Sequence, residues 1–147
     1  MIRNAFALAA LVVAAACGGL RPEPAPSSNI RSDYYAMMFV GGRFGKPGLS
    51  LQVLSDSVTT VLDSVVLTGL DASYDMWRRL ASEGGITAAN RTILETVTFG
   101  DSALRDNGRV VFARNGMRDT TMNFSSTWRR ERAGWSIVLD SVQPVRR

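Results

Sequence analysis

A few acidic and phenolic side chains could provide chemistry in this chain. Glu95 lies on one face of a predicted strand whose other members are apolar: Ile93, Val97 and Phe99. Its carboxyl group is therefore expected to point into an apolar interior, where burial would raise its pKa and allow it to act as a general acid or base. The alternatives are that this face lies at the mouth of the interior, or that Arg114 pairs with Glu95.

Three further residues are candidates for catalysis. Tyr34 and its neighbour Tyr35 lie on a predicted helix, where a tyrosine hydroxyl either donates a hydrogen bond in a site or is satisfied within the core. Asp63 and Asp140 lie in or beside predicted strands and could enter an interior pocket, although Asp63 also suits a turn. The spacing of these acids does not specify a mechanism.

The composition excludes several kinds of site. The sequence contains no histidine, which removes Ser-His-Asp and Cys-His catalysis and most zinc sites. A glycine-rich phosphate loop and a calcium loop with EF-hand spacing are also missing from the sequence. We therefore predict that the protein uses no metal and no cofactor.

The single cysteine, Cys17, follows an export signal. Arg3 provides a basic start, and an apolar run extends from Ala5 to Ala16. A membrane-spanning helix needs roughly 20 apolar residues, so this shorter run is typical of a signal-peptide core. Residues 14–17 resemble the bacterial lipobox, in which the cysteine is lipidated and begins the mature protein. The alternative is a plain secreted protein with an unmodified cysteine.

These features divide the chain into three parts. Residues 1–16 are the predicted signal peptide, residues 17–29 are the lipidated cysteine and a Pro/Ser-rich tether, and residues 30–147 are the folded domain. Proline favours extended, solvated backbone, which suits a tether. We predict export and anchoring to a membrane of the bacterial cell envelope. Because Gly18 and not Asp follows the cysteine, the signal resembles outer-membrane sorting if the cell is Gram-negative.

The chain is basic through arginine. Its formal net charge is +4, and Lys46 is the only lysine. Acids are interspersed with the arginines, so the basic face with interleaved aromatic residues that nucleic-acid binding needs is not predicted. The arginine pairs at 78–79, 129–130 and 146–147 are predicted to be solvated, or alternatively to attract anionic lipid headgroups weakly.

Helical patterns come first along the domain and strand patterns follow. Apolar spacing predicts a short helix near residues 32–38, another at 49–54, and an amphipathic helix from Asp71 that ends at Gly84. Alternation predicts strands at 58–62, 65–67, 91–99, 102–114, 122–128 and 135–145, with a bulge near 106–108 and a hairpin turn at Asn115. This order predicts an α+β fold in which helices cover one face of an antiparallel sheet.

Several segments resemble nuclear-transport-factor-2-like domains, the SnoaL-like superfamily. The similar pieces are residues 54–58, residues 67–72 running into Trp77, residues 100–103, residues 127–130 and residues 134–138. The resemblance implies a cone, in which a curved sheet wraps around N-terminal helices and leaves a pocket. Members of the family include isomerases, dehydratases, hydrolases, polyketide cyclases and non-catalytic binding or assembly modules, so the fold does not give the function.

The resemblance also implies where a site would lie. Catalytic members place Asp, Tyr or His in the pocket, and many carry histidine in the last strand, where this sequence has Asp140 between Leu139 and Ser141. The aromatic and apolar residues that would line the pocket, or alternatively form a simple core, are Tyr34, Met38, Trp77, Phe99 and Trp128.

We therefore predict a membrane-anchored envelope lipoprotein with a non-catalytic domain. The domain would bind a small apolar ligand or a partner protein. One alternative is a small-molecule isomerase, dehydratase or hydrolase that uses Asp, Glu and Tyr as acids and bases. Another is a structural module that forms a homodimer through its exposed sheet face.

Overall fold

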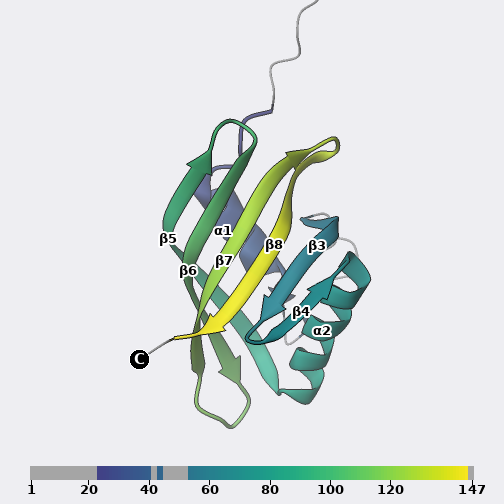
Figure 1. Cartoon of the computed structure of the whole chain (residues 1–147). Helices are drawn as coiled ribbons and strands as arrows, with labels where there is room; N and C mark the ends of the chain where they lie inside the picture. The colour runs from purple at the N-terminus through teal and green to yellow at the C-terminus, as the bar shows by residue number, and fades with distance from the viewer. Residues whose placement is uncertain (1–22, 41–42, 45–52, 146–147) are drawn as a thin grey trace, which may run out of the picture.

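The computed structural model describes residues 23–40, 43–44 and 53–145 (Figure 1). The elements in chain order are α1 (Ser28–Met37), β1 (Phe39–Val40), β2 (Arg43–Phe44), β3 (Leu54–Leu62), β4 (Val65–Thr68), α2 (Leu70–Glu83), β5 (Ile86–Phe99), β6 (Ala103–Arg114), β7 (Thr120–Glu131) and β8 (Gly134–Pro144). The predicted signal peptide, Cys17 and most of the helix expected at 49–54 lie outside the described residues. Within those residues, neither helix is long and apolar enough to cross a membrane.

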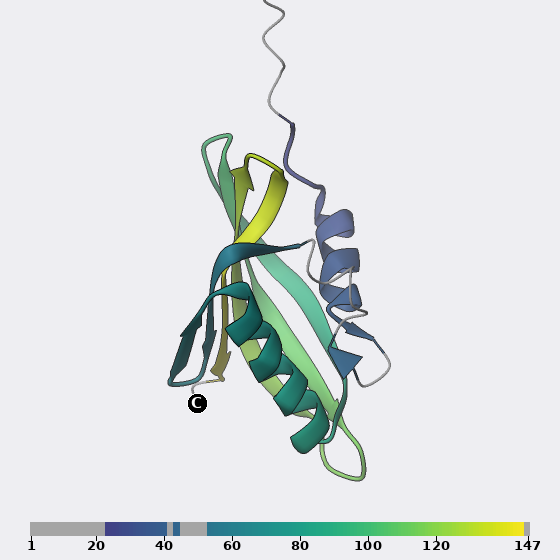
Figure 2. The ribbon, with the colours of Figure 1, turned by 90° about the vertical axis from the view of Figure 1, so that its right-hand side faces the viewer.

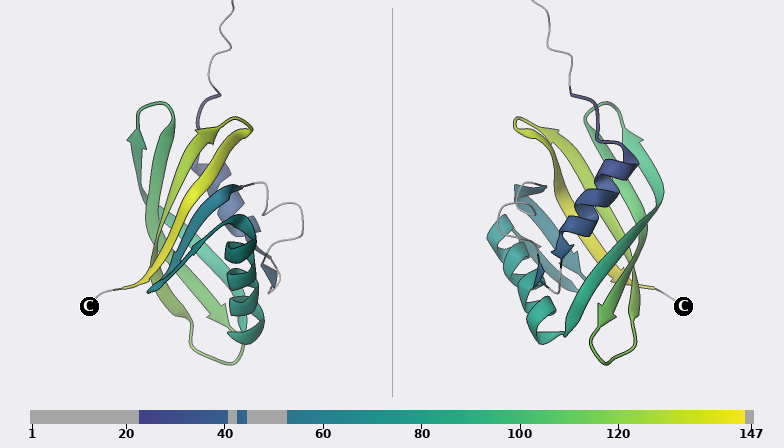
Figure 3. Two further views of the ribbon diagram at one scale, coloured as in Figure 1. Left: turned by 45° about the vertical axis from the view of Figure 1, so that its right-hand side comes forward. Right: turned by 180° about the vertical axis from the view of Figure 1, so that it is seen from behind.

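The main sheet is curved and unclosed, with strand order β4-β3-β8-β7-β6-β5. Both helices lie on its concave side (Figures 2 and 3), where α1 packs against β5 and α2 packs against β3. The predicted cone-like α+β fold is confirmed. One pairing departs from the antiparallel expectation, because β3 runs parallel to β8. No short hairpin joins these two strands, so their relative direction is not constrained by a turn.

Helix α2 follows its predicted pattern closely. Its buried residues recur every four positions at Ser73, Trp77 and Ala81, which places one face against the sheet. The helix starts after Gly69, whose φ of 101° is a conformation that favours glycine. Asp71 therefore lies in the first turn, where its charge favours the helix dipole, and not at the capping position.

Helix α1 begins earlier than its apolar spacing predicts. The Ser27 hydroxyl caps it by accepting a hydrogen bond from the amide of Ile30, at 3.4 Å. Its buried residues are Arg31 and Tyr35, one turn apart. Because an arginine occupies one of these positions, the buried face cannot be recognised from apolar periodicity alone.

A β-bulge in β5 decides which side chains of that strand face inward. Ile93 pairs with Gly108 and Glu95 pairs with Asn107, so Leu94 has no opposite residue. The extra residue shifts the alternation by one beyond the bulge, as a one-residue change of register must. The bulge was expected on β6 near 106–108, and the structure places it on the opposite strand.

The core fills the space between the concave face and the helices. It is built from large aromatic and aliphatic side chains on both helices and on β3, β5, β6, β7 and β8. Its most completely buried large side chains are Trp77, Trp128, Tyr35, Ile137, Val58, Val110 and Val142.

Replacing Gly108 tests the packing at the bulge. A Cβ atom built at this position would lie 2.0 Å from the carbonyl oxygen of Thr92 and 2.8 Å from the ring of Phe124. We therefore expect Gly108→Ala to lower the free energy of unfolding by roughly 1–3 kcal/mol, as overpacking does, in a denaturant titration. Gly116→Asn is the control, because its site is open and asparagine tolerates the φ of 69°. Equal stability of Gly108→Ala and wild type would contradict this account.

Candidate functional site

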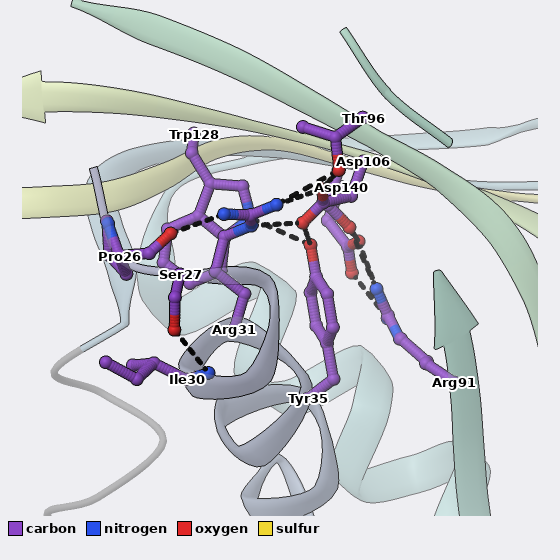
Figure 4. A network of polar contacts seen from close by, with 11 residues as sticks. Pro26, Ser27, Ile30, Arg31, Tyr35, Arg91, Thr96, Asp106, Trp128 and Asp140 are labelled. Atoms are coloured by element: carbon purple, nitrogen blue, oxygen red, sulfur yellow. Dashed lines mark hydrogen bonds and ion pairs between the residues drawn. The ribbon is translucent and has the colours of Figure 1, made fainter. Parts of the chain in front are cut away.

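A polar row crosses the interior of the cone at one level. Five inward-facing residues on neighbouring strands are in register across the sheet: Thr96, Asp106, Ser126, Asp140 and Thr60. All but Thr96, which lies on the edge strand β5, are fully buried. Such groups must be hydrogen-bonded to be tolerated. The helices contribute partners at both ends of the row, and most of the network is visible in Figure 4.

Asp106 is held by an arginine from α1. The Nε atom of Arg31 lies 2.7 Å from Oδ2 of Asp106, and its Nη2 atom lies 2.8 Å from Oδ1. Thr96 donates a further hydrogen bond to Oδ1, at 2.7 Å. The remaining Nη1 atom of Arg31 donates to the carbonyl oxygen of Pro26, just before the helix. This bidentate pair fastens α1 and the segment before it to the sheet.

Tyr35 connects the same carboxylate to the aromatic core. Its hydroxyl donates to Oδ2 of Asp106 at 2.9 Å and accepts from the indole Nε1 of Trp128 at 2.7 Å. Burial and the negative charge of Asp106 raise the pKa of Tyr35 well above its ordinary value. The tyrosine therefore remains a neutral hydrogen-bond donor and does not serve as a base.

Asp140 forms the second ion pair, with Arg91 of β5. Two nitrogen–oxygen distances of 2.7 and 2.9 Å join the guanidinium to both carboxylate oxygens, and Ser126 donates to Oδ1 at 2.7 Å. Burial alone would lower the pKa of Arg91, but the charge and hydrogen bonds of Asp140 raise it above its ordinary value. The guanidinium also lies 5.0–5.9 Å from the ring centroids of Phe124, Tyr35 and Trp77.

On the other side of Asp140, the polar row ends on α2. The hydroxyl of Thr60 donates to that of Ser73 at 2.8 Å, and both residues are completely buried. The two aspartates and two arginines balance in charge, and each carboxylate accepts hydrogen bonds on both oxygens. Every carboxylate oxygen of the two acids is thus already engaged by a donor within the domain. The arrangement is therefore suited to holding the fold.

The structure brings together three of the residues predicted to line a pocket. Met38, Trp77 and Trp128 are buried in the same core cluster. Tyr34 is half-buried, and its ring centroid lies 6.1 Å from that of Trp128. Phe99 lies elsewhere, because it is 46% exposed on the outer face of the sheet, where the guanidinium of Arg105 covers its ring.

The predicted acids separate in space. Asp140 is inward and paired, whereas Glu95 is exposed on the outer face and accepts a hydrogen bond from Asn107 at 3.0 Å. Glu95 was expected to point inward, and this expectation is wrong. The bulge at Leu94 shifts the alternation by one residue, so Thr96 and not Glu95 faces the interior. Asp63 occupies the exposed β3–β4 turn with a φ of 53°.

Sequence reasoning missed the charged members of the network other than Asp140, namely Arg31, Arg91 and Asp106, as well as the serine and threonine residues beside them. Neither arginine was singled out from the sequence, and Asp106 was assigned to a local break in its strand. A signal for Asp106 does exist, because it alternates with apolar residues of β6 that are also buried, Leu104 and Val110 among them. Arg91 has a similar signal, because it alternates with Ala89 and Ile93, which belong to the core or pack against it. Arg31 has none, because it lies on a short helix whose buried face is not apolar.

The hollows of the described surface lie away from the polar row. A groove of about 590 Å3 separates α2 from β3 and β4, and a hollow of about 430 Å3 lies on the outer face of the sheet. Two more, of about 410 and 490 Å3, flank Glu23 and Trp135. A smaller apolar hollow of about 220 Å3 is lined by Leu80, Ile86 and Phe112 among others. Among the described residues, no cluster of acids could hold a metal ion.

A curved six-stranded sheet around two helices defines the nuclear-transport-factor-2-like fold, as the sequence predicted. Solved structures with this fold include a candidate calcium/calmodulin-dependent protein kinase type II association domain from Thiobacillus denitrificans (17% identity, TM-score 0.66, covering 84% of this chain and 100% of that one). A candidate dehydratase of the nuclear-transport-factor-2-like family from Streptomyces avermitilis is also similar (14% identity, TM-score 0.60, covering 81% and 94%).

A nuclear transport factor 2-like superfamily protein from Salmonella enterica is similar to the same degree (15% identity, TM-score 0.61, covering 80% of this chain and 91% of that one). No protein-family profile matches the sequence, and no curated protein matches it significantly. Likeness at this level of identity establishes the fold and leaves the activity open.

Removing one partner of the inner ion pair tests its structural role. We expect Asp140→Ala to destabilise the domain by about 3–5 kcal/mol, because it leaves Arg91 charged and buried without a partner. The double variant Arg91→Met/Asp140→Leu should recover most of that loss. Asp75→Ala breaks an exposed pair with Arg78, so it should cost less than about 1 kcal/mol. Equal unfolding free energies for Asp140→Ala and Asp75→Ala would rule out this role.

Proposed function

We propose that this protein is an envelope lipoprotein held by Cys17, and that its domain acts by association with a partner. The observation that carries this proposal is the state of the inward-facing acids. Asp106 and Asp140 are both fully buried and held by arginines with bidentate geometry. Because these buried charges are paired and the space around them is packed, the interior is rigid and its acids are already engaged within the domain. We therefore place partner binding on the surface of the domain.

The outer face of the sheet is the surface that best fits a second copy of the chain. Its central row, in register across β5 to β8, consists of Glu95, Asn107, Ser125 and Ser141. Hydrogen bonds of 3.0 and 2.9 Å link the first three, so these side chains are already ordered before binding. Leu94, which is 66% exposed, borders the hollow beside them.

The chemistry of this face supports self-association. Short hydroxyl and amide side chains allow two sheets to approach closely, and exposed Leu94 and Leu139 supply apolar area to bury. A twofold dimer brings the same patch together from both copies, so one self-complementary face is sufficient. The similar Thiobacillus denitrificans protein is itself named as an association domain.

A dehydratase-like activity is the second candidate, favoured by the hydrogen bond between Tyr35 and Asp106 and by the similar Streptomyces avermitilis protein. Both residues are buried, at 1% and 0% exposure, and the hollows described above are lined by other residues. A substrate would have to displace α1 to reach them. A small apolar molecule is not expected in the 220 Å3 hollow, which is smaller than the roughly 300 Å3 of common ligand sites. The groove of about 590 Å3 is large enough, but it lies between α2 and β4, away from the polar row.

Fatty-acid labelling tests the anchor. Cells that express the full chain should incorporate labelled fatty acid into the protein, and the protein should fractionate with membranes. Cys17→Ala should lose both properties, because the modified thiol is the only attachment point that we propose. Ser28→Ala is a control that leaves the lipobox intact. Label that persists in Cys17→Ala would disprove the assignment.

Substitution of Leu94 tests self-association. The domain from residue 23 onward should sediment as a dimer, and Leu94→Arg should weaken it by roughly 30-fold in Kd, or about 2 kcal/mol, by placing a charge in the apolar part of the interface. Met117→Arg is the matched control, since Met117 is 60% exposed in the distant β6–β7 turn. A monomer at all concentrations, or equal dimer affinity for both variants, would contradict the proposed interface.

A further inference from the structure

The N-terminal segment is fixed to one end of the cone before α1 begins. The carbonyl oxygen of Glu23 accepts a hydrogen bond from the indole Nε1 of Trp135 at 3.1 Å. The carbonyl of Pro26 accepts another from Arg31. The chain therefore enters the domain beside the β7–β8 turn, at the same end as the β5–β6 turn (Figures 1 and 3). We call this end, residues 99–102 and 129–135, the anchor end.

The remaining tether is short compared with the domain. Six peptide steps separate Cys17 from Glu23, and a fully extended chain advances at most about 3.6 Å per residue, so the lipid lies within about 22 Å of the anchor end. Strand β6, which runs from this end to the opposite one, has 12 residues and is thus about 40 Å long. Because about 40 Å exceeds about 22 Å, the β6–β7 turn at the opposite end stays at least roughly 18 Å from the lipidated cysteine.

The arginines of the β7–β8 hairpin suit a lipid surface. The β7–β8 hairpin carries Arg129, Arg130 and Arg132 against a single acid, Glu131. The carboxylate of Glu131 accepts a hydrogen bond from Ser55 at 3.1 Å and so is engaged within the domain. Arginine is attracted to anionic headgroups by about 1 kcal/mol for each residue near the surface.

Aromatic and acidic side chains complete this end. Trp135 is partly exposed and Phe99 is 46% exposed, and tryptophan is a residue type enriched at membrane interfaces. The acids nearby are Asp101, on the exposed β5–β6 turn, and Glu23. The hairpin residues 129–135 hold three arginines and one acid, a net charge of +2, and Asp101 and Glu23 offset this charge over the anchor end as a whole. The attraction to lipid therefore comes from the arginines of the hairpin itself. The β6–β7 turn carries Arg118 beside Asp119 and has no net charge.

We propose that the anchor end rests on the bilayer surface, so that the lipoprotein has a fixed orientation. This inference rests on the proposed lipid anchor, and the occupant of the surface is an anionic membrane. The opposite end, with the groove between α2 and β4, is then directed away from the membrane. The outer face of the sheet stands upright and remains open to a neighbouring copy on the same membrane.

Site-specific fluorescence tests the orientation. Lipidation consumes the Cys17 thiol, so the acylated full chain with Ser102→Cys or Met117→Cys carries one label at either end. In phosphatidylcholine vesicles that contain phosphatidylglycerol and a headgroup quencher, we expect several-fold stronger quenching at position 102 than at position 117. Equal quenching, or stronger quenching at 117, overturns the proposal. Failure to incorporate fatty acid would instead be detected before reconstitution, and it would reject the anchor itself.

Charge variants test the contact with lipid. Arg129→Gln and Arg132→Gln should each lower the ratio of docked to undocked domains by about fivefold on these vesicles. Arg118→Gln, at the opposite end, should leave the ratio unchanged. On pure phosphatidylcholine all three variants should match the wild type. Equal effects of Arg132→Gln and Arg118→Gln on the anionic vesicles would overturn the contact between hairpin and membrane.

Discussion

The cost of burying charge governs this structure. Two carboxylates lie fully buried at the centre of a sheet, and such groups are tolerated only when ion pairs and hydrogen bonds replace the water they lose. The need to pair these charges determines how both the helix layer and the sheet of the fold are arranged. Helix α1 must dock where Arg31 and Tyr35 meet Asp106, and β5 must bulge so that Arg91 before the bulge and Thr96 beyond it both face inward.

The same requirement explains why the interior is better suited to support than to reaction. A catalytic acid or base needs an accessible site and a proton that can move. Here the carboxylates are saturated by guanidinium and hydroxyl donors, and the aromatic rings of Tyr35, Trp77 and Phe124 surround Arg91. A rigid interior of this kind supports our proposal that the domain acts through its surface, at the outer sheet face and the anchor end.

The sequence was sufficient for much of the fold and for little of the interior chemistry. Alternating strands, the periodic face of α2 and the glycines at turns are local signals, and they produced the correct class and family resemblance. The pairing of Arg31 with Asp106 joins residues 75 positions apart, and no local pattern reports it. Glu95 was misplaced because one unpaired residue, Leu94, reverses the facing of the strand beyond it.

The parallel pairing of β3 with β8 has a consequence for biosynthesis. The final strand lies in the middle of the sheet, between β3 and β7, and it brings Asp140 to Arg91. A chain made from its N-terminus exposes two unpaired strand edges and an unneutralised arginine until the last strand emerges. Strands β5, β6 and β7 are joined by short turns and can pair locally, whereas β3 and β7 have no partner between them before β8 is made. The two parts of the sheet are therefore joined only when β8 is inserted, which makes this long-range pairing the slow step expected for the fold.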